Sequence, residues 1–205
     1  MDKAKGYLNI EVAHEKAVSE FAQRDPADIS EKSATMFDSG ENFIRLFFLN
    51  KDYFVYYPSG EIIDSEGEKA SIYHAIIFLH YLNTADGTPL SGNWISFKEL
   101  SGGEIYNQAF YKRAQKPFLK AFEDAPEKFV EAASKLGGFK LPFGDYGMVI
   151  PVLPRVPLAM VLTPGDDEIE TTCTILFDSR ANSYLPTEDY AHIPGLVIGE
   201  MRKMI

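Results

Sequence analysis

The chain has 205 residues, of which 45% are hydrophobic and 24% charged, as is usual for a folded globular domain. Its 30 acidic and 20 basic residues give a net charge of −10, which would repel the phosphates of nucleic acids, so no nucleic-acid partner is expected. The single cysteine, Cys173, excludes an intramolecular disulfide and an iron–sulfur cluster held by this chain alone, because such clusters need about four thiolates.

The longest apolar-rich stretch, residues 70–82, is too short to cross the ~30 Å hydrocarbon core of a bilayer, so no membrane insertion is expected. The start of the chain has no apolar run of signal-peptide length, and its acidic side chains do not suit a transit peptide. We therefore expect a cytoplasmic protein.

The first 65 residues predict helices followed by a β-meander. Apolar residues recur at helical spacing over 5–23, and a second short helix is expected over 27–35. Residues 41–50 and 53–63 are rich in Phe, Tyr, Ile and Val and are separated by a turn, so they predict two strands and a third short one.

Helices dominate the middle of the sequence. Ser65 and Glu68 have the spacing of a capping box and predict the start of a helix over about 68–83. A strand is expected over 93–100. Residues 101–138 then predict two or three helices, broken near Pro117 and Pro126.

The last third predicts strands at about 146–152, 156–163 and 171–177, with a short helical region after Pro186. Strands therefore gather in blocks separated by helices. This pattern favours an α+β fold with mainly antiparallel sheets over a doubly wound one. Because no linker composition stands out, a single domain over 1–205 is expected.

The sequence contains no glycine-rich phosphate loop, no Rossmann glycine triplet and no nucleophile elbow. His74 and His80 lie six residues apart, about 120° around a helix, so they cannot face one metal ion together. We predict no metal site, and each histidine has either a structural role or a role in another kind of site.

Two acidic segments have structural explanations that compete with a site. Asp178 directly follows a predicted strand and can bind the amides of its own turn, whereas Glu188 and Asp189 follow Pro186 and suit a helix start. The acidic residues of 166–170 do not have the spacing of an EF-hand, and a solvated hairpin tip is favoured.

Two basic features stand out against the acidic composition. Lys112, Arg113, Lys116 and Lys120 recur at helical spacing, so they form either a solvated face or a stripe that could hold a carboxylate or phosphate. Arg155 stands between apolar runs, where an arginine is seldom buried without a partner. Its candidate partners are Asp145, Asp178 and Glu188.

Several segments together resemble a known family. They are residues 92–117, 134–162 and 165–189, with the motif-like stretches Trp94–Phe97, Leu153–Pro157 and Tyr184–Asp189. Over roughly residues 70–190 the chain is similar to an uncharacterised family of anaerobic bacteria and archaea, the domain of unknown function numbered 3786. That family supplies no accepted catalytic residues.

The resemblance implies a companion of iron–sulfur or corrinoid methyl-transfer proteins. Because this chain lacks the cysteines of a cluster, a redox role does not transfer to it. The first hypothesis is therefore a non-catalytic accessory or binding domain with a protein partner in anaerobic one-carbon or redox metabolism. The cofactor, if there is one, is left open.

The alternative hypothesis is a small-anion-binding protein or an enzyme, with arginines and carboxylates around one pocket. The residues of that pocket would be Arg113, Arg155, His80, Tyr106, Asp145, Asp178, Glu188 and Asp189.

Overall fold

The computed structural model describes residues 2–205, with side chains from residue 10 onward. The chain divides into two compact units. The first unit extends to Thr88 and includes Ser183–Leu185, and the second consists of Pro89–Asn182 and Pro186–Ile205.

The first unit combines helices with a four-stranded antiparallel sheet in the order β1-β2-β3-β4. Its helices are α1 (Asp2–Ala22), α2 (Pro26–Ser33) and α3 (Ile72–Thr84). Its strands are β1 (Met36–Asp38), β2 (Phe43–Phe48), β3 (Lys51–Tyr56) and β4 (Ile62–Asp64). The predicted helix pair and meander are thus confirmed, and the three-residue strand β1 was missed.

Helix α3 covers one face of this sheet. Ile44, Leu46 and Phe48 of β2 are buried while the residues between them are exposed, the alternation expected of a strand with one covered face. The ring of Phe78 on α3 packs 5.0 Å from that of Phe48 and 4.8 Å from that of Tyr53.

The predicted start of α3 is wrong. Asp64 Oδ1 accepts hydrogen bonds from the amides of Glu66 and Glu68, both at 2.9 Å, so these residues form a turn after β4. The helix begins at Ile72, where the hydroxyl of Ser71 accepts a hydrogen bond from the amide of His74 at 3.3 Å.

The second unit contains a five-stranded antiparallel sheet in the order β5-β9-β8-β7-β6. Its strands are β5 (Trp94–Ser96), β6 (Phe139–Lys140), β7 (Tyr146–Leu153), β8 (Val156–Thr163) and β9 (Thr172–Asp178). The three long strands confirm the prediction, β5 is shorter than expected, and β6 was missed. Both sheets are antiparallel and helices separate the strand blocks, so the fold is α+β as predicted.

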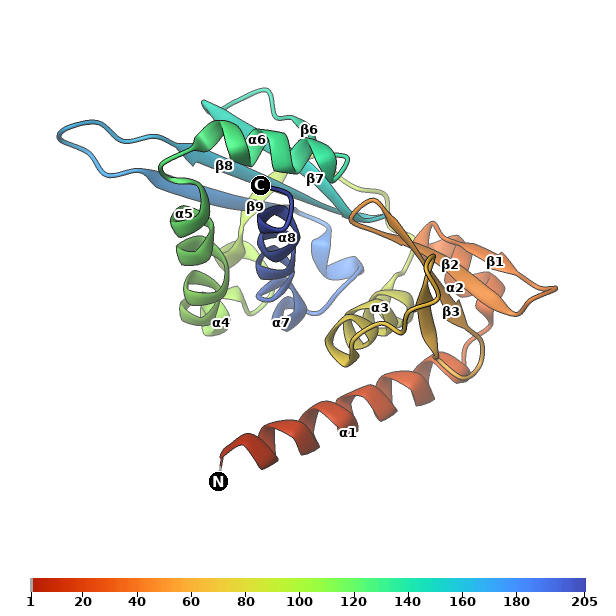
Figure 1. Ribbon diagram of the computed structural model, residues 1–205. Helices are drawn as coiled ribbons and strands as arrows, with labels where there is room; N and C mark the ends of the chain where they lie inside the picture. Colours follow the sequence, from red (N-terminus) through yellow and green to blue (C-terminus); the bar gives the residue numbers. More distant parts are fainter. Residues whose placement is uncertain (1) are drawn as a thin grey trace. The chain divides into compact units, whose positions relative to one another are not determined.

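Helices lie against one face of this sheet, as Figure 1 shows for α5, α6 and α8. The helical elements are η1 (Phe97–Glu99), α4 (Gly103–Phe110), η2 (Tyr111–Gln115), α5 (Lys116–Phe122), α6 (Pro126–Lys135), η3 (Ala181–Ser183), α7 (Thr187–Tyr190) and α8 (Ile193–Arg202). The opposite face carries a smaller apolar cluster of Leu141, Val149, Ala159 and Val161, against which Trp94 and Leu176 pack.

The helical run that carries the basic stripe has no break at Pro117. It continues from Gly103 to Phe122, and the π-helical segment η2 stands immediately before the proline-containing turn. Proline cannot donate to the helical hydrogen-bond ladder, and a π-helical turn is a known means of accommodating such an irregularity. The second predicted break, at Pro126, is confirmed because α6 begins there.

Candidate functional site

Asp178, one of the predicted binding residues, is used by the fold itself. Its carboxylate is buried at the end of β9 and accepts hydrogen bonds from the amides of Ser91, Gly92 and Arg180 at 3.1, 2.8 and 2.8 Å. The Ser91 hydroxyl donates a fourth bond at 3.0 Å. The carboxylate therefore fixes the loop before β5 to the end of β9.

Asp145 and Arg155 lie at opposite ends of β7. Asp145 is exposed just before the strand, and half-buried Arg155 stands in the turn between β7 and β8. A strand rises about 3.3 Å per residue, so the eight residues of β7 separate the two backbones by roughly 26 Å. The structure does not bring this pair together.

Three other predicted residues surround one imidazole. Arg113 Nη1 lies 3.0 Å from Nε2 of His192, which precedes α8. Burial and the nearby Arg113 guanidinium lower the pKa of His192, while Asp189 and Glu188 of α7 act in the opposite direction. At neutral pH the imidazole is uncharged, so its Nε2 accepts the hydrogen bond that Arg113 donates.

The two remaining predicted residues lie on separate helices. Tyr106 is half-buried on α4 in the second unit. His80 is half-buried on α3, which belongs to the first unit.

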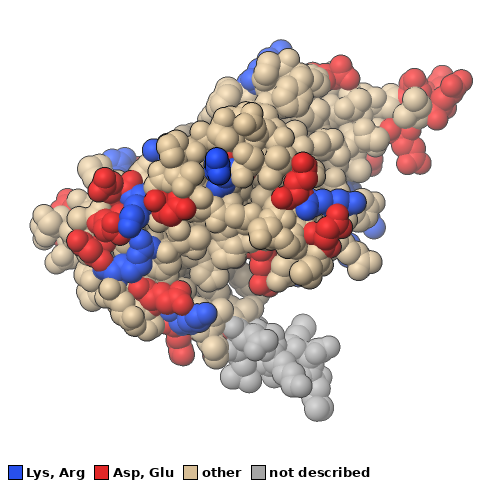
Figure 2. Space-filling view, turned by 180° about the vertical axis from the view of Figure 1, so that it is seen from behind, with Lys and Arg blue, Asp and Glu red and all other residues tan. Residues whose placement is uncertain are grey.

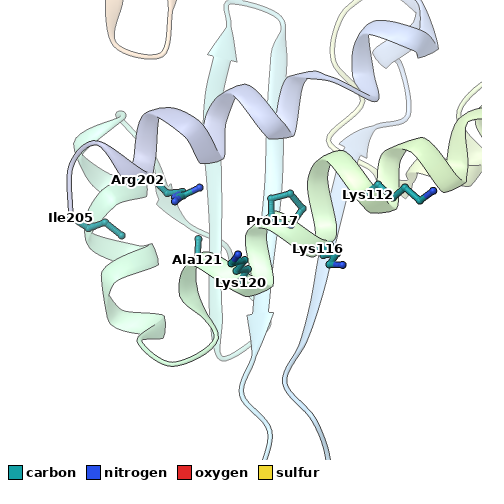
Figure 3. Close-up of a pocket in the computed structure, with 7 residues that line it drawn as sticks. All are labelled: Lys112, Lys116, Pro117, Lys120, Ala121, Arg202 and Ile205. Carbon is teal, nitrogen blue, oxygen red and sulfur yellow. The ribbon is translucent and has the colours of Figure 1, made fainter. Parts of the chain in front are cut away.

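The basic stripe on η2 and α5 borders a groove of about 680 Å³. Figure 3 shows that the lining side chains come from two segments, the η2–α5 run and the end of α8. The lining residues are Lys112, Lys116, Pro117, Lys120, Ala121, Arg202 and Ile205. We call this site the cationic groove. Its volume lies within the range of roughly 300–1,000 Å³ that is usual for small-molecule sites.

Buried aromatic rings on α5 and α6 determine which face of α5 borders the groove. Phe118 and Phe122 are fully buried on α5, and their rings pack 4.9 and 5.8 Å from that of Phe129 on α6. With this face of α5 turned inward, Lys116 and Lys120 are exposed on the outer face. On α8, buried Met201 holds the neighbouring Arg202 at the opposite side of the groove.

The four cations of the groove have no counter-ion among the described side chains. In the part of the chain whose side chains are described, no carboxylate oxygen lies within 4.0 Å of Lys112, Lys116, Lys120 or Arg202. Basic residues elsewhere do form ion pairs, among them Lys16, Arg24, Lys32, Arg45, Lys51, Lys69, Lys135 and Lys203. On a chain with a net charge of −10, the groove concentrates positive charge that the fold leaves uncompensated.

The lysines of this groove were visible in the sequence, but Arg202 was not. Helical spacing places Lys112, Lys116 and Lys120 on one face, whereas Arg202 joins them only through the packing of α8 beside α5. Arg113 belongs to the predicted stripe but turns to His192 and is absent from the groove lining.

The only cysteine of the sequence is no candidate nucleophile. Cys173 is half-buried on β9, and its thiol lies 3.6 Å from the carbonyl oxygen of Gln115 at the end of η2. Burial raises the pKa of this thiol to about 12, so it stays protonated at neutral pH.

A family model described as a domain of unknown function (DUF3786) matches residues 25–200. The chain belongs to the DUF3786 family. The predicted resemblance is confirmed, and the match extends beyond the range expected from the motifs. No curated protein and no solved structure matches the chain.

The DUF3786 match includes one side of the cationic groove and ends before the other. Lys112, Lys116 and Lys120 lie inside the matched residues, while Arg202 and Ile205 follow them. Among the described residues, no group of three or more His, Cys, Asp or Glu side chains could hold a metal ion. Within the same residues, no helix has the length and apolar character needed to span a membrane.

Proposed function

We propose that this chain is a non-catalytic binding domain that holds a multiply charged anion in the cationic groove. The observation that carries the proposal is a groove of about 680 Å³ lined by four cations, none of which has a carboxylate within 4.0 Å in the part of the chain whose side chains are described. Bringing like charges together without a counter-ion opposes folding, and a bound anion removes that repulsion.

The chemistry of the lining favours a ligand with two or more carboxylate or phosphate groups. Lysine ammonium groups act as point charges, whereas the planar guanidinium of Arg202 can donate two parallel hydrogen bonds to one such group. Pro117, Ala121 and Ile205 add apolar surface between the cations. The ligand class is therefore an anion with a compact apolar portion.

The lining also supports binding over catalysis. The residues that border the groove contribute no carboxylate, imidazole, hydroxyl or thiol side chain to it. General acid–base and covalent catalysis usually employ such groups; a lysine amine can also serve when it is desolvated, but Lys112, Lys116 and Lys120 are exposed. The alternative pocket of arginines and carboxylates has less support, since Asp178 is engaged by four internal donors.

An accessory role in anaerobic iron–sulfur or corrinoid metabolism is part of this proposal. It depends on the resemblance of the sequence and on the anion-binding character of the groove. We propose the cytoplasm as the location, and the net charge of −10 supports a ligand or protein partner over nucleic acid.

Thermal unfolding in the presence of different anions tests the proposal. At matched ionic strength, phosphate, pyrophosphate and citrate should raise the Tm in order of increasing charge, because a ligand that binds only the folded state stabilises it. Glycerol at the same concentration should have no comparable effect. A Tm that is insensitive to anion charge would contradict an anion-binding function.

A further inference from the structure

The loop between β8 and β9 carries the opposite charge to the groove. Its acidic residues are Asp166, Asp167, Glu168 and Glu170, all exposed, and Ile169 among them is 65% exposed. We call residues 164–171 the acidic tip. Figure 1 shows this loop extending beyond the helices of the second unit, and Figure 2 shows its acidic side chains gathered at the end of the projection.

The acidic tip is ordered by its own hydrogen bonds. Asp166 Oδ1 accepts bonds from the amides of Glu168 and Ile169, both at 2.9 Å, and the Asp166 amide donates to the Ile169 carbonyl at 2.9 Å. Those two amides lower the pKa of Asp166, which keeps it ionised. A segment already held in one conformation loses little entropy when it binds.

Tip and groove match in charge and in apolar surface. The tip presents four carboxylates around an exposed isoleucine, and the groove presents four cations around Pro117, Ala121 and Ile205. No ion pair joins the two within the described part of the chain. We therefore consider a contact between the tip of one molecule and the groove of another.

We propose that the cationic groove receives the acidic tip of a second copy of this chain. Because every copy has both features, two copies can exchange tips about a two-fold axis, and that closed arrangement leaves neither groove empty. Ile169 would meet the apolar part of the groove while the carboxylates neutralise its cations. The inference rests on the proposed function in one respect, namely that the groove accepts anions.

The net charge of each copy limits the strength of such a dimer. Two chains of −10 repel each other at long range, so the attraction must come from close contacts. The Debye length is about 8 Å at physiological ionic strength, so salt screens the long-range repulsion before it weakens close, partly buried pairs. The dimer should therefore form best at moderate salt and dissociate at high salt.

Sedimentation equilibrium of the full chain with charge-reversed variants tests the inference. The groove variant is Lys116→Glu with Lys120→Glu, and the tip variant is Asp167→Lys with Glu168→Lys. Asp166 is left unchanged because it orders the turn. The control variant is Glu11→Lys with Glu15→Lys. It changes the net charge by as much as the tip variant does, but at exposed sites on α1.

The wild type and the Glu11/Glu15 control should approach twice the monomer mass of 23.0 kDa between micromolar and millimolar concentrations. Each reversed variant alone should dissociate about tenfold or more readily, because like charges would then face each other. An equimolar mixture of the two variants should recover association, since it contains one unaltered tip and one unaltered groove. Circular dichroism of each variant verifies that it is folded.

A monomeric wild type, unchanged dimerisation of the reversed variants, or a mixture that stays monomeric would overturn the inference. Measuring pyrophosphate binding by the tip variant distinguishes failure of the dimer inference from failure of the proposed anion-binding function. If the tip variant binds pyrophosphate while the wild type is monomeric, the groove binds anions but not the tip. If the wild type dimerises through the tip and pyrophosphate does not bind, the small-ligand function is the part that fails.

Discussion

Gly195 on α8 lies directly against the backbone of Arg113 in η2. A Cβ at position 195 would stand 2.9 Å from the Arg113 carbonyl oxygen, closer than real Cβ atoms approach. The glycine thus allows α8 to pack beside the helical run that carries the groove lysines.

Alanine substitution at the two glycines of α8 should have opposite effects. Gly195→Ala should destabilise the protein by about 1–3 kcal/mol, because one of the two backbones must move. A Cβ at Gly199 would meet no neighbouring element within 4 Å, so Gly199→Ala should stabilise by up to about 1 kcal/mol through helix propensity. Urea unfolding of both variants measures the difference. Equal effects would contradict the close approach at Gly195.

Asp178→Ala should strongly destabilise the second unit. The substitution leaves three backbone amides and the Ser91 hydroxyl without the buried carboxylate that accepts their hydrogen bonds. Hydrogen bonds to a charged group contribute about 1.5–3 kcal/mol each, so a loss on the order of 3 kcal/mol is expected. Asp124→Ala, at an exposed position of the second unit outside both the tip and the groove, is the matched control and should stay within about 0.5 kcal/mol of the wild type. Urea midpoints that agree for the two variants would refute the structural role of Asp178.

The protonation of His192 should make stability depend on pH. Its pKa in the folded protein is lowered from an ordinary value of 6.5, so the unfolded chain takes up this proton first as the pH falls. The stability associated with His192 is therefore complete above about pH 6.5 and declines below it. His192→Gln keeps a neutral acceptor for Arg113 and does not titrate. Urea unfolding from pH 7.5 to 5 should show a shallower decline for the variant, and parallel curves would exclude this linkage.

Cys173 should react slowly with thiol reagents in the native protein. With a pKa of about 12, its thiolate population at pH 8 is far below that of an unfolded cysteine. Modification by DTNB should be at least about a hundredfold slower in buffer than in denaturing urea. Comparable rates in the two solvents would show that the thiol is not held in a buried environment.

Much of the fold could be predicted because the strongest patterns are local. The apolar runs of β7, β8 and β9 and the alternation in β2 indicate strands without knowledge of their partners. The start of α3 was mispredicted because two serines, Ser65 and Ser71, could each cap the beginning of a helix. Asp64 accepts hydrogen bonds from the amides of Glu66 and Glu68 in the turn that follows it, and Ser71 caps the helix that begins after this turn. The strands β1 and β6 have three and two residues, too few to show a period.

Only the lysine side of the cationic groove could be predicted, because only that side has a local pattern in the sequence. The spacing of Lys112, Lys116 and Lys120 is a property of one helical run, so the sequence shows it. Arg202 reaches them through tertiary packing, and the approach of α8 to η2 at Gly195 has no local signal. Asp145, one of the three candidate partners of Arg155, lies at the other end of β7, and the length of this strand separates the two residues although they are only ten positions apart.

Calorimetric titration with pyrophosphate, at protein concentrations where the chain is monomeric, measures anion binding in the cationic groove itself. Two double variants locate the binding. Lys116→Gln with Lys120→Gln removes two groove charges, and Lys98→Gln with Lys128→Gln removes two exposed charges that do not line the groove.

The wild type and the Lys98/Lys128 variant should bind pyrophosphate equally. The Lys116/Lys120 variant should bind it about tenfold or more weakly, since one lost charge-assisted hydrogen bond is worth about 1.5–3 kcal/mol. Absence of binding by the wild type, or an equal loss of affinity in both variants, would contradict an anion site at this groove.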